Sequence, residues 1–443
     1  MWTEARLAWR LGRGADRREW WRAGLTAAGA ALATGFAQAA VALAALRGQY
    51  RVSVGGLLDQ QGERSGVVLA LLLLLVPVLG FLGQCARIGA VHRDRRLAGL
   101  RLAGATPAQV RRIAALETGP ACLLGSLLAT VAAVTAVLRL WNSPEPAAWA
   151  GLALIALGVP VVGTAVAVLA LRRLVASPLG RVRRVRPRGG RGPLLVSGLL
   201  FFVLLGALAA FGGTRGWLPL TVFALVLLAG AGTVGLAGAM ARLAGRLVAR
   251  RARTAAALIA AERLRDDPWA AARTHAAVLL VTVVGTGFAG VRQALLADLR
   301  RMRQDHGLGM PMSFYTTGID LTGAAILVAL AITLCGLAVA TAESLASRRR
   351  GLAAQVAAGV PRAVLGRALL LETALPLLPA LVLAGAGGMA IGTWYATVTG
   401  GTVTVPYAAL LVPVLVYACC LLSAATALPL LHRSARPGEL RYA

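Results

Sequence analysis

The residues of this chain that could do chemistry form a pattern suited to binding rather than to catalysis. Arg95 and Arg96 lead into a short apolar helix, and Gly104 separates it from a second helix in which Glu117 enters apolar sequence. An echo of this order returns 255 residues later around Gly359. A basic rim, an apolar face and a sharp glycine turn are what a docking loop needs.

The residues expected to contact a partner fall in two loops, 93–111 and 347–363. They are Arg95, Arg96, Leu97, Leu100, Arg101, Gly104 and Thr106 in the first loop, and Arg350, Leu352 and Gly359 in the second. Thr106 followed by Pro107 predicts an N-cap and a first-turn proline for the next helix. The second copy is degenerate, with Gln355 where the first has Leu100. The two loops are therefore not expected to be equivalent.

Two acidic residues stand where each loop enters apolar sequence, Glu117 and its counterpart Glu372. A carboxylate at the edge of a membrane is costly unless it faces other helices or an arginine. For Glu117, Arg87 and Arg112 are candidate partners. A structural ion pair is favoured over a proton relay at both positions, although a relay remains an alternative.

The sequence lacks the residues that several kinds of chemistry require. All 46 basic residues are arginine, so the chain has no lysine for a P-loop or a Schiff base. The five cysteines fall within expected membrane spans and predict no disulfide framework. Asp305, His306 and the nearby Met302, Met310 and Met312 have no spacing typical of a metal site. The chain is therefore not expected to be an enzyme, and no metal site is predicted.

Composition places these loops in a membrane protein. The sequence is 58% hydrophobic with a mean hydropathy of +0.73, and its apolar residues form blocks long enough to cross a bilayer. Ten spans are expected, at 22–46, 65–90, 112–138, 148–172, 194–211, 217–240, 273–297, 321–343, 364–395 and 406–431. The block 364–395 contains Pro376 and Pro379, which favour one kinked or tilted span over two.

The net charge of +29 follows from membrane orientation and does not indicate nucleic-acid binding. With a cytoplasmic N-terminus, 37 of the 46 arginines fall on the inside and 9 on the outside. This strong bias predicts that both termini are cytoplasmic. Polar residues such as Gln38, Gln84 and Arg292 lie in or near spans, where they either line a path or join helices.

The repeat predicts a duplicated architecture, because self-similarity at a long period usually marks duplicated units. The expected parts are a four-span unit at 1–175, a two-span linker at 176–253 and a second four-span unit at 254–443. Each unit begins with an Arg- and Trp-bearing segment, Ala5 to Arg22 and Ala257 to Arg273, suited to the membrane interface. The fold class is thus an all-α integral membrane protein.

The stretch RRLAGLRLAGATPAQVRRIAALE, residues 95–117, resembles the cytoplasmic loop of FtsX-like (MacB-type) ABC transporter permeases. That loop usually reads basic, basic, acidic, apolar, then L-R-A-L-G-A-S, then V or I, then E. Here Arg96 stands where the family often has an acidic residue. The resemblance implies a plasma-membrane permease that binds two copies of a separate ABC ATPase, which supplies the ATP and Mg²⁺ sites.

The resemblance also implies coupling of ATP hydrolysis to export or extraction of a substrate. A hydrophobic or amphiphilic substrate, such as a membrane lipid, an amphiphilic drug or a peptide, suits a pathway between apolar helices. Many relatives carry a large extracytoplasmic domain, but the longest outside segments here, 47–64 and 298–320, are too short to fold one. Two alternatives are a mechanotransmission protein that controls an outside partner and an ion-driven secondary transporter.

Overall fold

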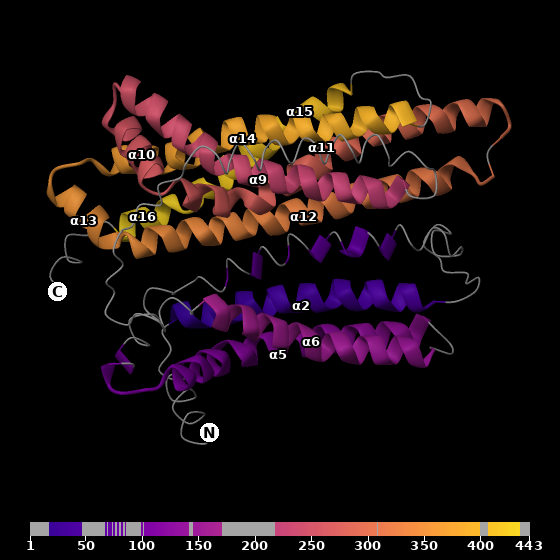
Figure 1. Cartoon of the computed structure of the whole chain (residues 1–443), viewed down its shortest axis with the longest axis horizontal. Helices are drawn as coiled ribbons and strands as arrows, with labels where there is room; N and C mark the ends of the chain where they lie inside the picture. The colour runs from indigo at the N-terminus through magenta and orange to yellow at the C-terminus, as the bar shows by residue number, and fades with distance from the viewer. Residues whose placement is uncertain are drawn as a thin grey trace. The chain divides into compact units, whose positions relative to one another are not determined.

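The protein is helical throughout the part that the structure describes. The computed structural model describes residues 17–46, part of 67–85, 99–100, 102–140, 145–170, 218–307, 309–398 and 406–434 (Figure 1). Every regular element within these ranges is an α-helix. Eight candidate membrane spans are present there, which indicates a multi-pass membrane protein and confirms the all-α expectation.

The eight spans correspond to eight of the ten expected from sequence. They lie in α2 (Arg17–Ala45), α5 (Pro107–Leu140), α6 (Pro146–Ala170), α9 (Leu218–Arg251), α11 (Pro268–Gln304), α12 (Met312–Ser347), α14 (Arg362–Val398) and α15 (Tyr407–Ala425). Of the other two, 65–90 is described only in part and 194–211 lies outside the described residues. The count of ten stays a prediction. The block 364–395 forms a single helix, as its two prolines suggested.

The chain divides into two compact units, Met1–Pro187 and Arg188–Ala443. Helix α9, which was expected to belong to a linker, packs against α11 and α14 inside the second unit. Its Leu225, Val226 and Ala229 lie in the same buried core as residues of those two helices. The predicted boundaries at 175 and 253 stay predictions.

In the first unit α2, α5 and α6 pack on one another. Gly125 of α5 meets α2 so closely that an added Cβ would overlap the carbonyl oxygen of Ala27. The fully buried Gln38 amide donates hydrogen bonds to Thr130 Oγ1 (2.9 Å) and to the carbonyl oxygen of Leu152 (3.1 Å). Gln38 therefore joins α2 to α5 and α6, which is the second of the two roles considered for it.

In the second unit α11 and α14 form the most extensive helix pair. Their backbones meet at small residues: a Cβ on Gly388 would lie 2.6 Å from the carbonyl oxygen of Val283. A Cβ on Gly392 would lie 3.1 Å from the Cα of Gly290. Close backbone approach at glycines is a usual way for helices to associate where both are surrounded by lipid.

Large apolar side chains point outward along several spans. Leu128 of α5, Leu154 of α6 and Leu422 of α15 are each about 70% exposed within the protein (68%, 74% and 68%). Exposure of this kind is costly in water and favourable in hydrocarbon. The outward faces of these helices are therefore consistent with a lipid surrounding.

Candidate functional site

The first turn, defined here as residues 99–109, reverses the chain at Gly104. Gly104 has φ +95°, in the left-handed region that glycine adopts without a Cβ penalty. The amide of Ala105 donates to the carbonyl of Leu100 at 2.9 Å, and the amide of Ala103 to that of Gly99 at 2.9 Å. The six-to-one bond closed by Ala105 is the hydrogen bond that ends a helix in a Schellman motif. The expected turn is confirmed.

The helix that follows is capped as its sequence predicted. It begins at Pro107, and Thr106 and Gln109 bond each other in both directions. The amide of Gln109 donates to Thr106 Oγ1 at 3.3 Å, and the amide of Thr106 donates to Gln109 Oε1 at 2.8 Å. This reciprocal capping box satisfies two amides that the first helical turn leaves without partners.

The second turn, residues 354–364, reproduces the first at an offset of 255. Val360 donates to the carbonyl of Gln355 at 3.0 Å, and Ala358 donates to that of Ala354 at 2.9 Å. Gly359 has φ +90°. Helix α14 begins at Arg362, which is 255 residues after Pro107. The repeat is thus a repeat of backbone hydrogen bonds, even where the side chains differ.

The exposed side chains of the two turns are different. Leu102 is 65% exposed in the first turn, whereas Ala357 stands at the equivalent place in the second. Arg350 is exposed, but Leu352 is only 2% exposed and belongs to the interior. Four further predicted contact residues lie outside the described residues: Arg95, Arg96, Leu97 and Arg101.

Leu352 is buried because it enters an apolar cluster that we call the turn cluster. The buried members of the turn cluster are Leu345, Leu352, Leu365, Leu369, Ala427 and Leu431, flanked by Ile259, Val356, Val360 and Leu428. Most of them come from α12, α13 (Arg349–Ala357), α14, α16 (Leu428–Ser434) and α10 (Ala255–Asp266), while Val360 and Ala427 lie between helices. Figure 1 shows α10, α13 and α16 together at one end of the second unit.

Beside the turn cluster, Glu372 binds two arginines. Its Oε1 lies 2.7 Å from Nη1 of Arg348, and its Oε2 lies 3.0 Å from Nη1 of Arg263. The Glu372 side chain is 19% exposed. Both carboxylate oxygens are therefore held by guanidinium groups, which agrees with the structural ion pair favoured for this residue. Glu117 is half-buried at the equivalent place in α5.

Sequence reasoning missed Arg263 as a partner of Glu372. The segment that contains Arg263 was expected at the membrane interface, which stays a prediction; within it, α10 buries one face against the protein. Ala256, Ala260, Ala261 and Leu264 are buried where α10 packs on α9 and α14. The spacing of small residues on this face, at positions 256, 260 and 261, was the available signal, because small residues permit close helix packing.

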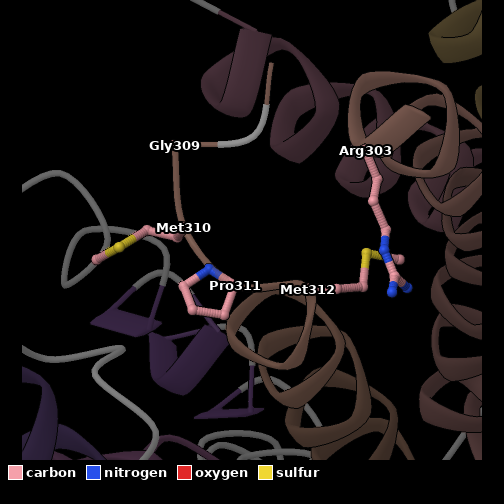
Figure 2. A pocket seen from close by; sticks show the side chains of 5 residues that line it. All are labelled: Arg303, Gly309, Met310, Pro311 and Met312. Atoms are coloured by element: carbon pink, nitrogen blue, oxygen red, sulfur yellow. The ribbon is translucent and has the colours of Figure 1, made fainter. Parts of the chain in front are cut away.

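The opposite end of the second unit has an open hollow of about 490 Å³ between α11 and α12. It is lined by Arg303, Gly309, Met310, Pro311 and Met312. Figure 2 shows Met312 beside Arg303, while Met310 points away from both. Met310 and Met312 thus do not converge on one point. Among the described residues, no group of three His, Cys, Asp or Glu side chains is placed to hold a metal ion.

No protein-family model and no curated protein matches this chain.

Proposed function

We propose that this chain is the membrane subunit of an ABC-type transporter and that its two turns dock a separate ATPase. The observation that supports the proposal most is the second copy of the first turn, with the same glycine conformation and the same two hydrogen bonds. Two turns with the same backbone suit a partner that is itself a pair of equivalent subunits, because each turn can then meet the same surface of one subunit.

The path from each turn into the membrane is direct. The first turn leads into α5 and the second into α14, and each helix is long and apolar enough to cross a bilayer. A rigid helix that begins at the docking surface transmits displacement of the turn into the membrane. Such coupling needs an ATPase that binds one membrane conformation better than the other, by a few kcal/mol.

ATP and Mg²⁺ belong to the partner in this proposal. The chain has no lysine, so it cannot build the lysine-containing phosphate loop of such ATPases. Its own contribution is the docking surface, the helices that move and the path for a substrate. The wide apolar surface of α5, α6 and α15 favours a hydrophobic or amphiphilic substrate that enters from the lipid.

The ion pairs of Glu372 weigh against an ion-driven transporter. A carboxylate that accepts and releases protons in a transport cycle must lose its cationic partners in one state. Here both of its oxygens are bound to arginines within 3.0 Å. The alternative is a protein that controls an outside partner and transports nothing. Such a complex would contain that outside partner and would move no lipid.

The test is to isolate the tagged full chain from the membranes of its native cell and to identify the proteins that remain bound. We expect an ATPase with a Walker A motif, in a ratio of two ATPases to one permease by native mass spectrometry. The Leu102→Asp variant, purified in parallel, should retain less of it. A chain that retains no ATPase, or a complex with two permeases, would contradict the proposal.

A further inference from the structure

We propose that Glu372 is a positioning residue that locks the second turn to α10, so that displacement of the turn reaches α9 as well as α14. This inference rests on the proposed function of the second turn. The route passes from α13 to α10 through side-chain contacts with Glu372 of α14, although α11 and α12 separate α10 from α13 along the chain.

The first link joins α13 to α14. Arg348 stands immediately before α13, and its guanidinium binds Glu372 of α14 at 2.7 Å. Helix α13 has only nine residues and no side-chain cap at its start. A helix this short is marginal by itself, so its position depends on contacts with its neighbours. These contacts include the Glu372 ion pair and the burial of Leu352 in the turn cluster.

The second link joins the same carboxylate to α10. Arg263 lies in the last turn of α10 and reaches the other oxygen of Glu372 at 3.0 Å. Ile259, one turn earlier in α10, packs against the turn cluster. One carboxylate thus holds two cations from separate elements, and removal of that carboxylate would leave two like charges facing each other.

The third link joins α10 to α9. Where the two helices meet, a Cβ on Gly245 of α9 would lie 3.0 Å from the carbonyl oxygen of Ala261 and 3.1 Å from Cβ of Leu264. Backbones this close leave little room for sliding. Movement of α10 is therefore passed to α9, which completes the route from the second turn.

A matched control lies on the exposed surface of α10. Glu262 pairs with Arg265 three residues later, and both side chains are about half exposed (53% and 47%). Exposed pairs within one helix contribute little to structure. Glu262→Gln therefore makes the same chemical change as Glu372→Gln, on a neighbouring helix, without touching the lock.

The experiment measures the distance between α10 and α13 in the full chain, reconstituted in lipid nanodiscs without any ATPase. The five cysteines are replaced by alanine, and spin labels are attached to new cysteines at Leu258 and Ala354, both of which are exposed. We expect a narrow distance distribution in the parent and in Glu262→Gln. In Glu372→Gln it should become at least about twice as wide, because Arg263 of α10 and Arg348 before α13 no longer share a carboxylate.

A distribution in Glu372→Gln as narrow as in the parent would overturn the inference. If that variant does not fold, Arg348→Ala replaces it, since the carboxylate then keeps Arg263 as a partner; the same widening is expected, and its absence is equally decisive. The distance measurement uses no ATPase. Failure to find a partner ATPase would therefore contradict the proposed function without changing the interpretation of the distances.

Discussion

The two turns share one backbone and are held in different ways. The first turn is closed by its own residues, through the reciprocal bonds of Thr106 and Gln109, and it presents the exposed Leu102. The second has Pro361 in place of that cap, and its helix α13 is fixed by buried Leu352 and by the ion pair of Arg348 with Glu372.

Under the proposed function, this difference predicts that the two turns act differently on the partner. A self-closed turn with an apolar side chain at its surface is suited to gripping a partner, because exposed apolar side chains supply contact area. A turn made of small residues and bound firmly to its neighbours is suited to passing movement on. What the two copies retain in common is the backbone turn, which depends on glycine and on little else.

The largest loss of stability is expected from substitutions where two helices of one unit approach closely. Gly125→Ala and Gly388→Ala each place a Cβ against a backbone carbonyl that cannot move aside, of Ala27 and of Val283. Overpacking of this kind should cost about 3 kcal/mol or more of unfolding free energy. Unfolding of the purified variants in mixed micelles, followed by circular dichroism, measures it.

Gly158→Ala and Gly235→Ala are the controls for the two units. An added Cβ at either position meets no atom within 4 Å, so these changes should be neutral or slightly stabilising. If Gly125→Ala were as mild as Gly158→Ala, the close contact of α2 with α5 would be refuted. The same comparison in the second unit uses Gly388 and Gly235.

A smaller effect is expected from charge on the exposed faces of the turns. Leu102→Asp should weaken retention of the ATPase by about tenfold, which corresponds to about 1.4 kcal/mol. Ala357→Asp, at the equivalent exposed position of the second turn, should weaken it less, because little apolar contact area is lost there. Titration of purified ATPase onto the chain in nanodiscs compares the two variants. Equal losses would remove the proposed difference between the turns.

The smallest effect should be the same in both turns. Gly104→Ala and Gly359→Ala meet no neighbouring atom, so the only penalty is the positive φ, about 1 kcal/mol. Faster hydrogen exchange of the amides that follow each turn would report it. Gly351→Ala, within α13 and equally open, should not accelerate exchange. Faster exchange after only one of the two substitutions would show that the positive φ does not cost the same free energy in both turns.

The local structure of the turns could be predicted from sequence because short-range rules determine it. The left-handed glycines at 104 and 359, the N-cap at Thr106 and the start of α5 at Pro107 all follow from residue types a few positions apart. Hydropathy likewise located the eight spans within the described residues, since spanning helices are set by length and composition.

The tertiary partners could not be predicted in this way. Arg263 and Glu372 are 109 residues apart, and no local pattern relates them. Leu352 was expected on a docking face, but whether a leucine is covered depends on which helices pack over it, here those of the turn cluster. For the same reason, the sequence did not predict that α9 shares a buried core with α11 and α14.

The place at which α14 crosses α11 divides α14 into unequal arms. From Arg362 to Gly388 the helix extends about 40 Å toward the second turn, and from Gly392 to Val398 only about 10 Å toward the other end. Tilting of α14 about this closest approach would move its end at the second turn about four times as far as its other end, in proportion to the two lengths. A movement of about 4 Å at the second turn would thus reach the far end of α14 as about 1 Å.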